Sequence, residues 1–326
     1  SATRMTHTIL QTLNREIAAL TYGQRPPELY EPIRYIMSLG GKRLRPALTL
    51  LSSALFTDQW AAFAKPAIAV EVFHNFTLMH DDIMDAAPLR RGQPTVHQKW
   101  NPNVAILSGD VMLVCAYELL LEADPAKLPL VLKKFNRCAA EVCEGQQLDM
   151  NFERLPTVAE AEYIDMIRLK TAVLLGFSLE LGGILADAPT AHTDLLYETG
   201  VAIGTGFQLK DDLLDVFGEQ AKFGKQVGGD IIANKKTFLL IKALELAQGE
   251  TANTLNRWLQ AAEFDATEKV QAVTKIYNQL NIKALTENKM NEHFAHGLRC
   301  LETVDVPETR KQPLRDFVER LIHRES

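Results

Sequence analysis

Apolar residues recur along this chain with the period of an α-helix, and the alternation typical of β-strands is hard to find. The pattern predicts helices over residues 67–84, 106–122, 128–143, 160–175, 195–216 and 236–247. Several of these segments are apolar over most of their circumference, which is typical of helices in the interior of a large bundle. The sequence therefore predicts an all-α protein.

The organisation of the chain favours a single helical domain over residues 1–326. Prolines and glycines separate the helical segments, and no low-complexity linker or fixed-period repeat divides them. Residues 1–4 precede Met5, and we interpret them as a cloning remnant outside the fold. The longest apolar stretch, residues 171–188, contains Glu180 and three glycines, so it predicts a buried helix and not a membrane span.

Composition and charge narrow the classes of partner. Hydrophobic residues make up 47% of the chain and charged residues 23%, and the formal net charge is −6. No long basic stripe is present, which argues against nucleic acid. The cysteines (Cys115, Cys138, Cys143 and Cys300) form no CxxC pair and no Cys/His cluster with zinc spacing. We therefore expect idle, reduced thiols in a cytoplasmic protein without a signal peptide.

Two copies of an Asp-Asp-x-x-Asp motif, at residues 81–85 and 211–215, follow apolar helical runs. At 3.6 residues per turn, the first and last Asp of each motif share one face. Crowded carboxylates require a cation, and oxygen ligands suit Mg²⁺, which shares its remaining positions with substrate phosphates. A solvated acidic helix end is the alternative for one motif, but duplication argues against it. The candidate metal ligands are Asp81, Asp82, Asp85, Asp211, Asp212 and Asp215.

Basic clusters alternate with the acidic motifs. Arg90 and Arg91 follow the first motif, Lys225, Lys235 and Lys236 follow the second, and residues 40–46 read GGKRLRP. Arginine offers a planar fork for phosphate oxygens, and lysine a point charge. One such cluster alone would be interpreted as a surface charge patch. Their alternation with the acidic motifs predicts diphosphate binding bridged by metal ions.

These motifs resemble those of the trans-isoprenyl diphosphate synthases, the family of farnesyl, geranylgeranyl and longer polyprenyl diphosphate synthases. The matching motifs are GGKRLRP (40–46), VFHNFTLMHDDIMD (72–85), LRRG (89–92), LKTA (169–172), FQLKDDLLD (207–215) and GKQVGGD through Lys235 (224–235). They occur in the family's order and cover about three-fifths of the chain. The resemblance implies a single helical bundle of the isoprenoid synthase type with a central apolar cavity, usually as a homodimer.

The resemblance also implies a role for each matching residue. Asp81 and Asp85 would hold two Mg²⁺ ions and Asp211 a third, with Asp82, Asp212 and Asp215 in support. The allylic diphosphate would be bound by Arg90, Lys170, Lys225 and Lys235. The diphosphate of isopentenyl diphosphate would be bound by Lys42, Arg45, His74 and Arg91. Thr171 and Gln208 would lie beside the developing carbocation. An ideal helix places His74 about 20° from Asp81, on the site side, although the residue alone reads as a core histidine.

The implied reaction is a Mg²⁺-dependent condensation. The allylic substrate (dimethylallyl, geranyl or farnesyl diphosphate) ionises, isopentenyl diphosphate attacks the cation, and the released diphosphate takes a proton. An apolar interior excludes water that would quench the cation. Lys210 departs from the glutamine of many relatives; its charge could tune affinity beside Asp211, or it could point outward.

Product length depends, by the resemblance, on Phe76 and Thr77, five and four positions before the first motif. One aromatic residue with a smaller neighbour predicts a short product, and we favour geranylgeranyl diphosphate (C20) over farnesyl (C15) or longer diphosphates. An ideal helix places Phe76 about 140° from Asp81, so geometry alone would not select it.

Three alternatives are weaker. A terpene cyclase would lack GGKRLRP and carry a different second metal motif. A silent regulatory subunit would lose motif residues that are all present here. A di-iron bundle needs two ExxH pairs, and residues 71–74 form the only one.

Overall fold

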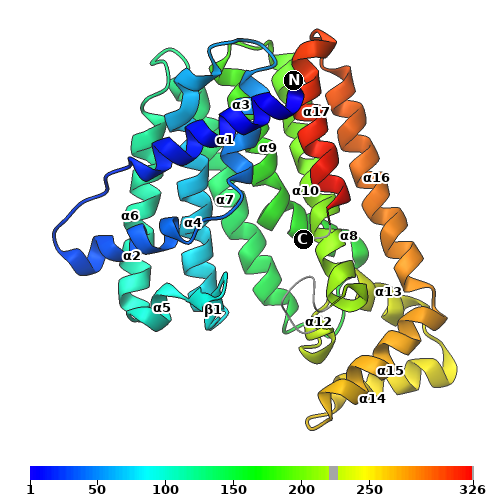
Figure 1. The fold of residues 1–326 in the computed structure, drawn as a ribbon. Helices are drawn as coiled ribbons and strands as arrows, with labels where there is room; N and C mark the ends of the chain where they lie inside the picture. Colours follow the sequence, from blue (N-terminus) through cyan, green and yellow to red (C-terminus); the bar gives the residue numbers. More distant parts are fainter. Residues whose placement is uncertain (220–226, 325–326) are drawn as a thin grey trace. The chain divides into compact units, whose positions relative to one another are not determined.

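The computed structural model describes residues 1–219 and 227–324 and confirms the all-α prediction (Figure 1). Within that part of the chain, the single sheet is a two-stranded ribbon. The chain forms two compact units. Unit 1 comprises Ser1–Asn136, Phe177–Tyr197 and Val304–Phe317, and unit 2 comprises Arg137–Gly176, Glu198–Thr303 and Val318–Ser326. The single domain therefore stays a prediction.

The helices follow one another with short connections. The first half of the chain contains α1 (Ala2–Ala18), α2 (Pro27–Ser38), α3 (Leu44–Ser53), η1 (Trp60–Phe63), α4 (Ala64–Met84), β1 (Leu89–Arg90), β2 (Gln93–Pro94), α5 (Val96–Lys99), α6 (Pro102–Leu120) and α7 (Leu128–Phe152). The second half contains α8 (Glu160–Ile167), η2 (Arg168–Ala172), α9 (Val173–Leu185), α10 (Thr190–Phe217), α12 (Gly229–Ile232), α13 (Phe238–Leu246), α14 (Gly249–Gln260), α15 (Ala266–Gln279), α16 (Ile282–Thr303) and α17 (Glu308–His323).

Each of the six predicted helical segments contains a helix, but some helices extend well past the prediction, as α7 does by continuing from residue 143 to Phe152. The segment 160–175 differs most, because α8 ends at Ile167 and a π-helical turn, η2, precedes α9. The buried helix expected within 171–188 is α9, and most of its residues are buried. Residues 1–4 are not outside the fold: α1 begins at Ala2, and Ser1 caps it by accepting a hydrogen bond from the N–H of Arg4.

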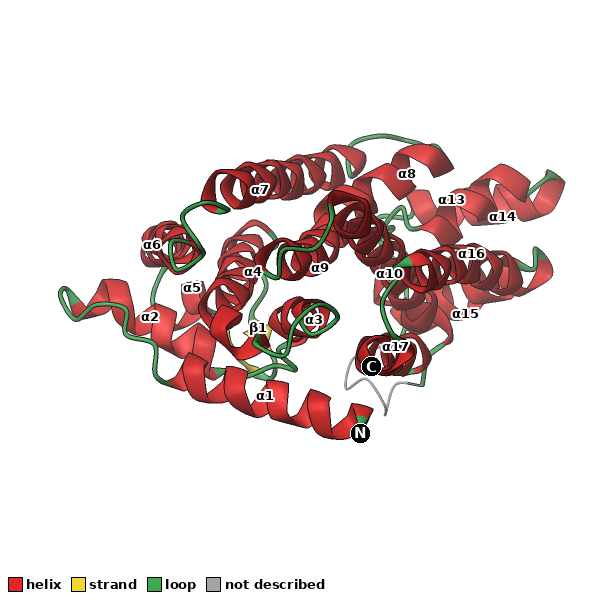
Figure 2. Ribbon diagram, turned by 90° about the horizontal axis from the view of Figure 1, so that it is seen from above, coloured by secondary structure: helices red, strands yellow, loops and turns green. Residues whose placement is uncertain are grey.

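In unit 1, α4 and α6 pack along each other. Figure 2 shows α3 beside α1 and α4. Hydroxyl groups of α3 hydrogen-bond to carbonyl oxygens of α9: Thr49 to Ser178 at 2.8 Å, and Ser52 to Leu179 at 2.6 Å. A Cβ at Gly182 would lie 2.0 Å from the Thr49 carbonyl oxygen, so only glycine permits this close approach.

Among the described residues, α6 has the length and hydropathy of a membrane-spanning helix. One such helix is weak evidence, because core helices have the same properties. Ala105, Met112 and Ala116 of α6 are fully buried within the fold, whereas Leu107 and Val114 are each 58% exposed.

In unit 2, glycines bring the helices into close contact. A Cβ at Gly200 of α10 would lie 2.5 Å from the Cα of Gly176 on α9. A Cβ at Gly206 would lie 2.4 Å from the Phe294 ring on α16. Helices α14 and α15 pack as a pair (Figure 1). This packing holds α10, the helix with the second acidic motif, firmly between its neighbours.

Candidate active site

The first acidic motif lies at the carboxyl end of α4. Helix α4 ends at Met84, and Asp85 is its C-cap, with its N–H bonded to the Asp81 carbonyl at 2.8 Å. Asp81 is half-buried and Asp85 is exposed, whereas Asp82 is buried at 5% exposure. Asp81 and Asp85 are therefore accessible from solvent, and Asp82 is not.

Asp82 is bound by Arg90 from the ribbon that follows α4. Arg90 donates from Nε and Nη2 to the two carboxylate oxygens of Asp82, each at 2.8 Å. Such a bidentate pair is among the strongest charged hydrogen bonds in proteins. Part of the charge of the motif is thus neutralised inside unit 1.

Arg91 contacts the glycine pair that opens GGKRLRP. Its Nη1 donates to the Gly40 carbonyl at 2.6 Å, and a Cβ at Gly41 would lie 2.8 Å from Nη2. Gly41 also has φ +124°, a conformation that other residues rarely adopt. Burial lowers the pKa of the Arg91 guanidinium, and nearby Glu71 raises it. Gly40 and Arg91 are 51 positions apart in the sequence, and this contact brings their two basic clusters together on one surface.

His74 lies in the same region. Desolvation, followed by the charges of Arg45, Arg90 and Arg91, holds the pKa of His74 well below its usual value. The imidazole is therefore neutral at pH 7 and can donate a hydrogen bond to an anion. Lys42 is exposed and Arg45 is half-buried. The structure thus brings three of the four predicted isopentenyl diphosphate ligands, Arg45, His74 and Arg91, into one neighbourhood of unit 1.

Arg43, the remaining arginine of GGKRLRP, has a structural role. It is 8% exposed, donates from Nη2 to the Met37 carbonyl at 3.0 Å, and lies 3.9 Å from Glu71. Its backbone is left-handed at φ +52°, where it caps α3.

The second acidic motif lies within α10, in unit 2. Asp211 is exposed, whereas Asp212 and Asp215 are buried at 2% and 8% exposure. Tyr163 donates its hydroxyl to Asp212 Oδ2, and Gln208 Nε2 donates to Oδ1 at 3.1 Å. Burial raises the pKa of Asp212 to about 7, although the Tyr163 hydrogen bond and the charge of Lys235 lower it. Neutral donors here replace the arginine that binds Asp82.

Asp215 fixes the loop before α12. Its Oδ2 accepts a hydrogen bond from the N–H of Asp230 at 2.9 Å, and its carbonyl accepts one from Gly228 at 2.6 Å. Gly228 has φ +86°. Lys235 is exposed, and its N–H donates to the Asp230 carbonyl at 2.9 Å. Lys225 lies outside the described residues.

Lys170 and Thr171 lie in the π-helical turn η2. Lys170 Nζ donates to Asp149 Oδ2 of α7 at 2.6 Å, and Thr171 Oγ1 lies 3.5 Å from Gln208 Oε1. Asp149 and Tyr163 are functional candidates that sequence reasoning missed. Each is a single polar residue on a helix, and only the fold reveals its partner.

Lys210 does not simply point outward. Its Nζ donates to the Ile322 carbonyl at the end of α17, at 2.5 Å. A cation at a helix C-terminus stabilises the unbonded carbonyls there. Burial lowers the pKa of Arg324, and nearby Asp211 raises it, so this chain end lies close to the second motif.

Phe76 and Thr77 lie on α4, before the first motif. The Phe76 ring lies 5.7 Å from Phe73 and 4.8 Å from His80. Thr77 Oγ1 donates to the His74 carbonyl at 2.6 Å. Both side chains are half-buried. The Phe76 ring therefore packs against other aromatic rings while part of it stays exposed.

The acidic motifs fit oxygen-preferring cations. Asp81, Asp85 and Asp211 are the accessible aspartates, and the buried ones are already hydrogen-bonded. In the described part of the chain, no three aspartates of one motif have donor oxygens within 4.8 Å of one another. Such a site needs further oxygen ligands, which Mg²⁺ commonly takes from water and phosphate.

Comparison with known proteins identifies the family of this chain. The family profile described as polyprenyl synthetase matches residues 26–279. The chain belongs to the polyprenyl synthetase family. Both acidic motifs and the basic residues of unit 1 lie inside the matched range, so the candidate site is the part of the chain that carries the family likeness.

Similar proteins match this polyprenyl synthetase over nearly its whole length. It is 36% identical over 315 residues to the geranylgeranyl pyrophosphate synthase of Geoglobus acetivorans, covering 96% of each chain. A crystal structure of a geranylgeranyl pyrophosphate synthase matches at TM-score 0.92 and 41% identity, over 100% of this chain and 99% of the other. The Corynebacterium glutamicum enzyme complexed with isoprenyl diphosphate and magnesium matches at TM-score 0.83 and 26% identity, over 98% of each chain.

Proposed function

We propose that this polyprenyl synthetase condenses isopentenyl diphosphate with an allylic diphosphate to give a short all-trans prenyl diphosphate, geranylgeranyl diphosphate. Two features together carry the proposal. Each of the two acidic motifs has an accessible aspartate, and a neutral His74 lies in a cationic neighbourhood. This combination suits two diphosphate groups, one bridged by metal ions and one bound by basic side chains.

Three Mg²⁺ ions are expected with substrate bound, held by Asp81, Asp85 and Asp211. When bound, they would stabilise the charge that builds on the departing diphosphate. Asp82, Asp212 and Asp215 support the site: their hydrogen bonds to Arg90, Tyr163 and the Asp230 backbone orient the motifs.

The basic residues divide between the two substrates. Lys42, Arg45, His74 and Arg91 bind isopentenyl diphosphate, and the neutral imidazole supplies a directed donor among the cations. Arg90, Lys170, Lys225 and Lys235 bind the allylic diphosphate. Arg90 and Lys170 already contact carboxylates, so each is held in place before substrate arrives. Thr171 and Gln208 flank the carbocation.

Product length is tested directly. The enzyme is incubated with isopentenyl diphosphate, farnesyl diphosphate and Mg²⁺, and the product is identified by mass spectrometry. A C20 product supports the proposal. Failure to elongate farnesyl diphosphate would favour a C15 synthase, and products beyond C20 a longer-chain enzyme.

Phe76 is the proposed limit on chain length. Its position five residues before Asp81 corresponds to about 7.5 Å along α4. We expect Phe76→Ala to give longer products while the diphosphate chemistry persists. Phe56→Ala is a matched control, because Phe56 is also half-buried and its ring packs on His192, not on a residue of α4 that carries the motif. A folded, active Phe76→Ala enzyme with only the wild-type product would assign Phe76 to packing.

The assembly is proposed to be a homodimer formed through α6. Leu107, Val114 and Leu121 are each more than half exposed and lie seven residues apart, so they form one apolar stripe. A second copy of the same stripe would cover it. Val114→Glu should give monomers in light scattering, whereas Leu246→Glu, on an exposed leucine of α13, should not. An unchanged dimer in Val114→Glu would place the interface elsewhere.

Within the described residues the four cysteines form no disulfide, which supports the predicted cytoplasmic location, where thiols stay reduced.

A further inference from the structure

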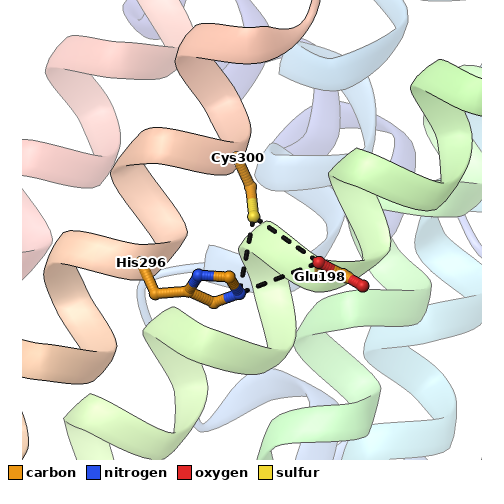
Figure 3. A group of neighbouring side chains, drawn as sticks. All are labelled: Glu198, His296 and Cys300. Atoms are coloured by element: carbon orange, nitrogen blue, oxygen red, sulfur yellow. Dashed lines mark hydrogen bonds and ion pairs between the residues drawn. The ribbon is translucent and has the colours of Figure 1, made fainter.

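Three side chains of unit 2 that the proposed reaction does not use converge on one point (Figure 3). Glu198 lies on α10, and His296 and Cys300 lie on α16. Cys300 Sγ lies 3.6 Å from both His296 Nε2 and Glu198 Oε2, and these two atoms lie 3.7 Å apart. Among the described residues, this is the group of three potential metal ligands with the closest donor atoms.

The spacing of the donors is compatible with a tetrahedral metal: the two separations from Cys300 Sγ are also those of hydrogen bonds to sulfur, but the third is too long for a hydrogen bond. A nitrogen–oxygen hydrogen bond spans about 2.7–3.2 Å, shorter than the 3.7 Å between His296 Nε2 and Glu198 Oε2. Tetrahedral zinc with its usual bond lengths separates sulfur from nitrogen or oxygen by about 3.5 Å, and nitrogen from oxygen by about 3.3 Å. The observed separations lie within about 0.4 Å of those values.

The site is built on rigid, closely packed helices. His296 and Cys300 are one helical turn apart, so both face α10. Gly297, between them, lets the helices approach: a Cβ there would lie 2.8 Å from Ile203 on α10. Cys300 is buried at 6% exposure, while the Glu198 and His296 side chains are about half exposed. The arrangement therefore offers a fixed sulfur ligand at the bottom and an open entrance.

We propose that Glu198, His296 and Cys300 bind a single Zn²⁺ ion, with a fourth position open to water. Thiolate, imidazole and carboxylate are the ligand types that zinc takes, whereas Mg²⁺ avoids sulfur. The bound ion would link α10 to α16.

The proton balance of binding follows from the ligand types. Zinc takes cysteine as the thiolate, so the binding of Zn²⁺ would release the Cys300 proton to the solvent. The thiolate and the carboxylate would then share a divalent charge instead of repelling each other.

This site is separate from the acidic motifs. Glu198 precedes Asp211 by 13 residues on α10, which is about 20 Å along the helix. An ion at Glu198 would clamp the start of the same helix whose later turns carry the second motif. Its effect on catalysis would come through the position of α10 and not through contact with substrate.

Cobalt is the probe, because a thiolate bound to Co²⁺ gives a charge-transfer absorption in the near ultraviolet that oxygen ligands do not give. The reduced full-length protein is titrated with Co²⁺ in excess Mg²⁺, which occupies the acidic motifs. We expect the absorption to saturate at one equivalent and to be lost in Cys300→Ser. Cys143→Ser, which removes an exposed thiol of unit 2, is the matched control and should leave it unchanged.

The exposed carboxylate provides a variant with little risk to folding. Glu198→Gln should weaken Co²⁺ binding at least tenfold, since even residues that only orient metal ligands contribute about 10–100-fold. Zn²⁺ should raise the melting temperature of the wild type more than that of Glu198→Gln. Basal Mg²⁺-dependent turnover of this variant should stay within about twofold of wild type. The proposal is overturned if no charge-transfer absorption appears, if it survives in Cys300→Ser, or if Glu198→Gln binds Co²⁺ with wild-type affinity.

Discussion

The two acidic motifs have the same sequence pattern but opposite surroundings. At the end of α4, Asp82 is bound by Arg90, and three arginines surround the neighbouring His74. Inside α10, Asp212 is bound by the neutral groups of Tyr163 and Gln208. Asp82 is balanced by one bidentate arginine, whereas Asp212 is bound by neutral donors and is also influenced by the charge of Lys235.

Different surroundings can give two copies of one motif different properties. Charge acts over several ångströms and attracts any anion, which suits capture of a second diphosphate beside the first motif. Hydrogen bonds from neutral donors act only at contact and fix geometry. The second motif is therefore the more sensitive to small displacements, and the first to changes in charge.

The largest expected effect is common to both motifs. Asp81→Ala and Asp211→Ala should each lower turnover by at least about 10²–10³-fold, because each removes stabilisation of the departing diphosphate. Steady-state kinetics at saturating Mg²⁺ measures this. Near-normal turnover in either variant would show that only one motif holds metal.

Next in size is the loss of the ion pair. Arg90→Met should lower the free energy of unfolding by about 3 kcal/mol. This value is at the low end of the range for a broken buried ion pair, because a quarter of the Arg90 side chain is exposed. Denaturant unfolding of the metal-free protein measures it. Adding Asp82→Asn to Arg90→Met should restore part of the loss; no recovery would mean that packing, not charge, dominates there.

A smaller effect is expected in unit 2. Tyr163→Phe removes only the hydroxyl that donates to Asp212, and should cost about 1–3 kcal/mol of stability. The same unfolding measurement compares it with Arg90→Met. Raised ionic strength should change the stability lost on Arg90→Met more than that lost on Tyr163→Phe. Equal salt dependence of the two would remove the distinction between the motifs.

The smallest effect is a pH dependence in unit 1. Because desolvation, followed by the charges of Arg45, Arg90 and Arg91, lowers the folded pKa of His74, the unfolded chain binds a proton first as the pH falls below about 6.5. Stability should therefore fall below that pH, with a slope of up to about 1.4 kcal/mol per pH unit from this group. His74→Gln should have a flatter profile between pH 5 and 7. An identical profile in the variant would exclude His74 as the cause.

The helices were predictable because their signal is local and repeated. The apolar run of residues 67–84 matches α4 to within three residues at its start. The exact end of a helix is less predictable, as at Ile167. The π-turn that follows it adds only one residue to a helical turn, which is too small a change to see in the apolar pattern.

The partners of the site residues were not predictable. Asp149, which binds Lys170, and Tyr163, which binds Asp212, carry no periodic or motif signal of their own. His296 and Cys300 have a readable helical spacing, but their third neighbour, Glu198, lies far away in the sequence. Such contacts depend on the packing of helices that are far apart in the sequence. A single sequence shows no pattern that reveals this packing.

The π-turn of Arg168–Ala172 also makes the length of this segment a constraint. A π-turn holds one residue more than an α-turn, so it is equivalent to a single insertion carried within a helix. Deleting one residue there would restore a regular helix with the same register on either side, but would remove the bulge that carries Lys170 and Thr171. Loops absorb a change of length without such a loss, as the stretch between α7 and α8 should. A deletion in the π-turn should therefore displace Lys170 from Asp149 even though no charged residue has been replaced.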